Sequence, residues 1–157
     1  MNTETRKLTL AVLLAVVSIL AIQPALVHAT SQTVTIIARG SATSTTSTVS
    51  PSARIYLRGM ANLNGGNIQL TQMSGILQIG PVFYTVIRGQ GQTNSQTNTF
   101  QLNLQVGGNN PGSLVLQGYA TLGEGYTVLF TPQQSNLEGQ YSLWLYGDLL
   151  ITQTPYS

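Results

Sequence analysis

Residues 57–66 read LRGMANLNGG, and residues 116–125 repeat the same frame as LQGYATLGEG. In both stretches apolar or small residues alternate with polar ones, and a period of two residues is typical of a half-buried β-strand. An Asn-Gly pair closes the first stretch and suits the positive φ angles of a tight hairpin turn. A glycine nevertheless occupies the middle of each strand, where it offers no side chain for packing. The two stretches therefore predict strands in which Gly59 and Gly118 hold equivalent places.

Similar alternation fills the chain beyond residue 29, where no helical periodicity is found. It is cleanest at 99–108, where the apolar residues from Phe100 to Val106 share one face. Many short strands separated by Gly, Pro and Asn turn signals predict an all-β fold, a single-domain antiparallel β-sandwich or small β-barrel of about eight strands, preceded by an N-terminal signal helix. The expected strands are 33–42, 53–64, 67–79, 82–91, 99–108, 113–122, 126–131 and 141–152, with a ninth if Ser74-Gly75 divides the third.

The faces of these strands follow from the period of two. Leu57, Gly59 and Ala61 share an apolar face that we assign to the core, so the glycine points inward and leaves a gap. We expect such glycines to let the sheet coil until it closes, or to make room for a large side chain; the alternative is a gap that admits a ligand. The recurring glycines, which suggest a hairpin-sized repeat, are Gly59, Gly89, Gly118 and Gly147. The large side chains available to fill the gaps are Phe83, Phe100 and Phe130.

Residues 1–29 carry the pattern of an export signal. Two basic residues precede an apolar run from Leu8 to Ile22, and Val27-His28-Ala29 presents short residues at the positions that a signal peptidase reads. We expect cleavage after Ala29, which makes Thr30 the first residue of a secreted or cell-surface protein. The alternative is a retained membrane anchor, because the apolar run can be extended to about 20 residues.

Composition divides the chain into three parts. After the signal at 1–29, residues 30–52 hold an N-terminal strand and a Ser/Thr-rich connector at 41–53, and residues 53–157 form a β-domain with hairpin-like repeats. We expect the N-terminal strand to pair within its own domain. The alternative is self-association, in which this strand adds to the sheet edge of a neighbouring copy. The low charge of the chain would oppose such assembly only weakly.

The charged residues exclude several classes of function. Beyond the signal the chain has four arginines and three acids, and it has no Lys, His or Cys. Because the arginines are scattered along the sequence, they predict no nucleic-acid partner. Without Cys or His we expect no thiol or Ser–His catalysis, no metal site and no cofactor. Glu124 and Glu138 form the one pair to consider for glycoside hydrolysis, which needs two carboxylates; we interpret both as solvated loop charges and expect no enzyme.

The outward face of the strands suggests a binding role. Exposed aromatic side chains among amides and hydroxyls suit the recognition of a carbohydrate or a surface protein; the alternative is that they pack under a loop. The expected function is a structural, adhesive or self-assembling role at the cell surface. A secreted carbohydrate- or small-ligand-binding domain is the second hypothesis, and a small outer-membrane β-barrel is the third. The residues of the expected face are Tyr56, Tyr119, Trp144 and Tyr146.

Overall fold

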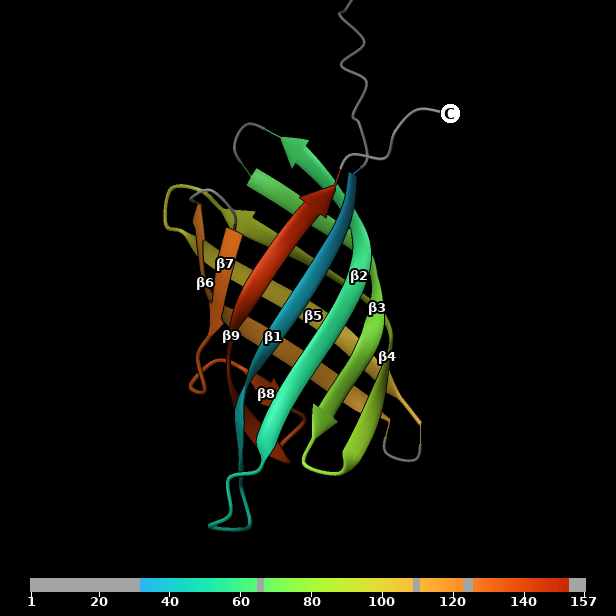
Figure 1. The fold of residues 1–157 in the computed structure, drawn as a ribbon, viewed down its shortest axis with the longest axis vertical. Helices are drawn as coiled ribbons and strands as arrows, with labels where there is room; N and C mark the ends of the chain where they lie inside the picture. The colour runs from blue at the N-terminus through green and yellow to red at the C-terminus, as the bar shows by residue number, and fades with distance from the viewer. Residues whose placement is uncertain (1–31, 65–66, 109–110, 123–125, 153–157) are drawn as a thin grey trace, which may run out of the picture.

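The fold is described from a computed structural model of the chain (Figure 1). The expected signal helix and its cleavage site lie outside the described residues, as do the turns at 65–66 and 123–125. The prediction of an all-β chain is confirmed, because the described residues form antiparallel strands joined by turns and short loops. The structure describes residues 32–64, 67–108, 111–122 and 126–152.

The described residues form nine strands, whose bounds match the alternation of the sequence closely. The third and last expected strands, Asn67–Ile79 and Tyr141–Thr152, begin and end where predicted. Alternation does not predict the short strand β8, because two residues carry no period. The strands are β1 Gln32–Ser44, β2 Ser52–Asn64, β3 Asn67–Ile79, β4 Val82–Asn94, β5 Thr99–Gly107, β6 Gly112–Leu122, β7 Tyr126–Phe130, β8 Asn136–Leu137 and β9 Tyr141–Thr152.

The strands form one closed barrel. Each strand from β1 to β7 pairs with the next, β7 pairs with β9, and β9 returns to pair with β1. Because β8 lies between β6 and β9 and continues the position of β7, the wall has eight strand positions. Of the two predicted architectures, the barrel is therefore the correct one. In Figure 1, β9, β1, β2 and β3 lie side by side and β5 crosses behind them.

The N-terminal strand closes the barrel and does not stand apart from it. β1 pairs with β2 on one side and β9 on the other, so that Ile37 lies opposite both Tyr56 and Asp148. The Ser/Thr-rich connector is consequently shorter than expected: it spans 45–51, because the residues on either side of it are paired in strands. The division between 30–52 and 53–157 falls after the first residue of β2, inside the wall of the barrel.

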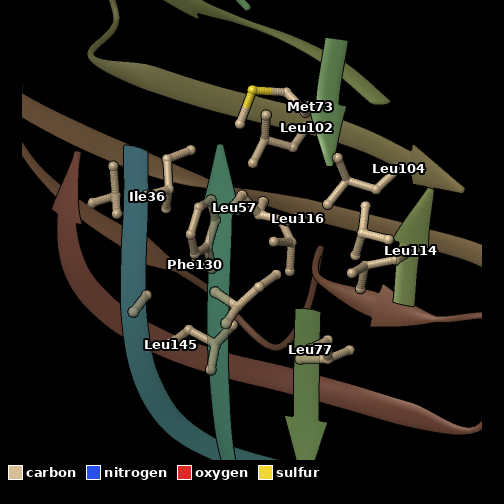
Figure 2. Close-up of a cluster of buried hydrophobic side chains, with 14 of the residues drawn as sticks. Ile36, Leu57, Met73, Leu77, Leu102, Leu104, Leu114, Leu116, Phe130 and Leu145 are labelled. Atoms are coloured by element: carbon tan, nitrogen blue, oxygen red, sulfur yellow. The ribbon is translucent and has the colours of Figure 1, made fainter. Parts of the chain in front are cut away.

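The barrel is filled by apolar side chains that alternate along the strands. Figure 2 shows Leu57, Leu102 and Leu116, from three different strands, packed in one cluster. Burying a leucine completely contributes roughly 1.5–3 kcal/mol, so this interior is the main source of stability. The largest fully buried side chains are Phe100, Phe130, Ile36, Ile55, Leu57, Leu70, Met73, Leu77, Leu102, Leu114, Leu116 and Leu137.

Gly118 shows why a glycine lies inside a strand. On β6 it pairs with Phe100 of β5 and Phe130 of β7, whose ring centroids are 5.5 Å apart. A Cβ added to Gly118 would overlap the carbonyl oxygen of Leu129 in β7 and would push the two strands apart. The absence of a side chain at Gly118 lets β6 and β7 approach closely in the closed sheet and leaves space between the two phenylalanines, so protein atoms fill the gap. The expectation for Phe83 is wrong, because alternation along β4 turns it outward, where it is 67% exposed.

A β-bulge on β3 places Met73 against Gly59. The pairing of β2 with β3 shifts between Arg58 and Met60, so β3 contains an extra residue there. Within this bulge Gln72 has a φ of 54°, in the left-handed region that non-glycine residues rarely adopt. A Cβ added to Gly59 would meet the Met73 sulfur and the β3 backbone. The third strand is thus bent but not divided.

Gln117 of β6 pairs with Gln101 of β5 on one side, but the break between β7 and β8 leaves its other side without a strand partner, and the loop between β7 and β8 fills that place. Ser135 Oγ donates to the Gln117 carbonyl oxygen at 2.9 Å and accepts from the Gln117 N–H at 3.0 Å. The Thr131 N–H donates to the same carbonyl oxygen, also at 3.0 Å. Because Ser135 is fully buried, these bonds satisfy backbone groups that water cannot reach.

Replacing Gly118 by alanine is expected to lower the free energy of unfolding by about 1–3 kcal/mol, because the added methyl group meets backbone that cannot move without opening the β6–β7 pairing. Gly107→Ala is the matched control, since there the nearest atoms belong to the flexible, exposed side chain of Ile87. Urea denaturation measures both variants. A Gly118→Ala protein as stable as the control would contradict the close approach of β6 and β7.

Candidate functional site

A row of large side chains crosses the outside of the barrel. Arg39 of β1 pairs with Tyr146 of β9 on one side and with Arg54 of β2 on the other. Arg54 pairs in turn with Gln78 of β3, and Gln78 with Phe83 of β4. Since directly opposite residues on antiparallel strands have Cβ atoms about 4.5–5.5 Å apart, the five side chains form a continuous band.

A second row lies beside the first, two residues away on the same face of each strand. Tyr56 pairs with Ile37 on one side and Ile76 on the other, and Ile37 also pairs with Asp148. The tyrosine and both isoleucines are about half exposed, so the row presents apolar area to solvent. We call the surface formed by both rows and their neighbours the arginine–aromatic face; its members are Ile37, Arg39, Arg54, Tyr56, Arg58, Ile76, Gln78, Phe83, Trp144, Tyr146 and Asp148.

Three of the four arginines in the described residues belong to this face. Arg39 and Arg54 are distant in sequence but directly opposite each other on paired strands, and Arg58 lies further along β2, opposite Thr35. Asp148 is the one acid that the described part of the chain places beside them. Strand pairing thus gathers arginines that are scattered along the sequence, and the face carries a positive charge.

The four aromatic residues predicted for a binding face all point outward. Trp144 and Tyr146 are 47% and 53% exposed on β9, and Tyr56 is 46% exposed on β2, with β1 between them. Tyr119 is 51% exposed on β6, and it connects to Tyr146 only through Leu129 of β7. The structure thus groups three of the predicted residues and places Tyr119 at the margin. Sequence reasoning missed the arginines and Phe83, whose proximity depends on strand register.

The arginine–aromatic face is hollowed. A depression of about 660 Å³ is lined by Tyr56, Phe83 and Tyr146 together with Arg39 and Arg54. Aromatic side chains provide large apolar area with defined geometry, and guanidinium groups bind carboxylates or phosphates through paired hydrogen bonds. The arrangement suits contact with a partner that carries acidic groups beside apolar surface.

The acids outside this face hold other positions. Glu138 lies in the turn between β8 and β9, where its Oε2 accepts a hydrogen bond from the Ser113 N–H at 2.9 Å. Glu124, its expected partner, lies outside the described residues. In the part of the chain that the structure describes, no three acidic, His or Cys side chains gather where a metal ion could bind. The same residues include no helix with the length and apolarity needed to cross a membrane.

Tyrosines contribute to the interior as well as to the outer face. Tyr84 of β4 is buried, and Tyr141 of β9 packs against the core. Burial raises the pKa of the Tyr84 phenol, and charge repulsion from Tyr141 raises it further. The Tyr84 phenol therefore stays neutral at physiological pH and brings no charge into the barrel.

The fold and its surface define a closed, filled β-barrel whose candidate recognition site lies on the outer wall. No protein-family model, no curated protein and no solved structure matches the chain. The chemistry of the wall is therefore the basis for assigning a function.

Proposed function

We propose that the protein is an exported, non-catalytic β-barrel with an adhesive role at the cell surface, and that the arginine–aromatic face is its contact surface. The observation that carries this proposal is the gathering of exposed Tyr, Trp, Phe and Arg side chains on adjacent strands. These residue types are enriched at protein interfaces and among energetic hot spots, whereas Lys is depleted. Single exposed apolar residues need no explanation, but a contiguous patch marks an interaction site.

The polarity of the wall favours a barrel that works in water. Its interior is apolar, and its outer side carries Thr, Gln, Asn and Arg between the aromatic residues. A membrane-spanning barrel has the opposite arrangement, with an apolar band facing lipid and a polar interior. The apolar interior and the polar residues on the outside thus make the outer-membrane barrel the least supported of the three hypotheses. The proposal of export is supported by the signal pattern of residues 1–29.

The charge of the face supports an acidic partner. Three arginines share it with a single aspartate among the described residues. Two copies pressed together through this surface would oppose arginine to arginine, which disfavours self-pairing there. An anionic polymer or an acidic protein surface at the cell envelope would complement the charge, and such attraction weakens as salt screens it.

Binding to immobilised poly-L-glutamate and polygalacturonate tests this proposal, because they present carboxylates on a peptide and on a sugar chain. Arg54→Gln is expected to weaken binding at low salt by about tenfold, since hydrogen bonds to charged groups contribute about 1.5–3 kcal/mol. Arg88→Gln, measured on poly-L-glutamate, is the matched control: it removes the same charge from β4, away from the face, where Arg88 hydrogen-bonds to Gln105. Equal losses in the two variants would show that only net charge matters and would contradict a dedicated face.

The second hypothesis, a carbohydrate-binding domain, would use the same face through its aromatic rings. It is supported by the exposure of Trp144 and Tyr146, which lie two residues apart on the same side of β9. The experiment above separates the two hypotheses. If the face stacks on sugars, Trp144→Ala and Tyr146→Ala abolish binding to polygalacturonate, and the unmodified protein does not bind poly-L-glutamate. If the face binds acidic groups, Arg54→Gln weakens binding to both polymers.

We propose self-association through β1 as a separate property, which would require exchange of this strand between copies. β1 is paired on both sides within its own barrel, and residues 45–51 would serve as the hinge. Thr35 and Leu150 lie opposite each other on β1 and β9, so Thr35→Cys/Leu150→Cys can lock β1 in place. Sedimentation velocity is expected to show oligomers at high concentration for the reduced protein and monomers for the oxidised one. Monomers in both states at every concentration would contradict exchange.

We also infer an internal repeat of three strands. β3 begins 59 positions before β7, and β4 begins 59 positions before β9. Gly59 and Gly118 have the same spacing, and each lies on the inward side of its strand, between buried apolar neighbours. The coincidence of strand starts and inward glycines supports a repeated unit in the wall.

A further inference from the structure

A trough of amide side chains lies on the outer wall next to the arginine–aromatic face. Its larger hollow, of about 840 Å³, extends over β3 to β6 and the β8–β9 turn, and a smaller one of about 320 Å³ lies over β3 to β5. Gln90 and Asn103 pair across β4 and β5 and line both hollows, so the two are joined. We call this surface the amide trough; its central residues are Gln72, Arg88, Gln90, Asn103, Gln105 and Glu138.

Two β-bulges shape the amide trough. One is the bulge on β3 that contains Gln72, and the other lies on β4, where pairing with β5 shifts between Val86 and Arg88. Beside them the regular pairing of β3 with β4 is interrupted between Leu70 and Gly75. Bulges redirect side chains and are frequent next to binding sites. After the β4 bulge, Arg88 and Gln90 both point outward into the trough.

Backbone strain is concentrated at the larger hollow. Gln72 and Glu138 have φ angles of 54° and 25°, and both residues line it. Asn98 is the one other non-glycine residue with positive φ in the described part of the chain, and asparagine tolerates this conformation well. The tight turn between β8 and β9, in which Glu138 and Gly139 both have positive φ angles, accounts for the backbone of Glu138. No turn accounts for Gln72, which lies in a bulge where glycine would adopt the same φ angle without strain. We therefore expect the Gln72 side chain to have a role of its own.

The lining of the trough combines amide groups with apolar area, and its charges nearly balance. Arg88 Nε donates to Gln105 Oε1, and Glu138 Oε2 accepts from the Ser113 N–H, so the two opposite charges are held in place. The other polar groups are mostly side-chain amides, each with two N–H donors and a carbonyl acceptor. Sugar hydroxyls also both donate and accept. A charged ligand, in contrast, would find no excess of opposite charge.

We propose that the amide trough binds a neutral oligosaccharide chain. From β3 to β6 it crosses three inter-strand spacings, ~14 Å, which is enough for a short run of sugar units. The described lining contains no aromatic side chain, so the ligand is held by hydrogen bonds, centred on Gln90 and Asn103. This site is separate from the arginine–aromatic face and does not depend on the function proposed for that face.

Calorimetric titration with cellohexaose, maltohexaose and N-acetylchitohexaose tests the proposal, with hexagalacturonate as the anionic comparator. At least one neutral hexamer is expected to bind, and Gln90→Ala/Asn103→Ala is expected to weaken that binding by about tenfold. Gln72→Gly relieves the left-handed strain, so it should keep or raise the melting temperature while it weakens binding. Gln133→Ala is the matched control, because Gln133 is an exposed amide outside the trough.

Three results would overturn the proposal. The first is no binding of any neutral hexamer at millimolar concentration. The second is binding that the trough variants leave unchanged but that Tyr146→Ala abolishes, which would assign the sugar to the arginine–aromatic face. The third is tighter binding of hexagalacturonate than of every neutral hexamer in the unmodified protein, which would contradict the neutral ligand.

Discussion

The barrel depends on close backbone contact at its seam, where the first strand meets the last. Gly147 of β9 lies opposite Ala38 of β1, and Gly40 is the corresponding glycine on β1. A Cβ added to Gly147 would overlap the carbonyl oxygen of Ile37, and one added to Gly40 would overlap that of Trp144. Larger residues would hold the strands apart and leave an open sheet with two unpaired edges. Gly40 and Gly147 thus let β1 and β9 pair closely enough to close the barrel.

Closure also determines where the protein can act. A closed barrel offers no free edge to which a peptide strand could add. A barrel of about eight strands encloses little more than the volume of its own side chains, and here aliphatic residues and two phenylalanines occupy it. The surfaces that we propose for binding therefore lie on the outer wall, where two different groups of side chains occupy adjoining strands. Arginines and aromatic rings lie over β9 to β4, and amides lie over β3 to β6.

Alternation in the sequence predicts most of this wall, because position along a strand decides which side chains are buried. It predicts the bounds of β3 and β9, the inward glycines and the outward aromatic residues. It does not predict which strands pair or in what register, and so it does not place Arg39 opposite Arg54. It also fails where a strand is irregular. A bulge such as that at Gln72 shifts the period by one residue, and the gap between β7 and β8 is bridged by Ser135 through hydrogen bonds that leave no periodic signal.

The most direct test of this account is native-state hydrogen exchange at the seam between β1 and β9. If the two strands close the barrel, their paired backbone amides should exchange only through global unfolding, as slowly as those between β5 and β6 on the other side of the wall. Protection of both sets should then yield the same opening free energy. Seam amides that exchange orders of magnitude faster than the β5–β6 amides would show that the first and last strands separate in the native protein, and would contradict a closed barrel.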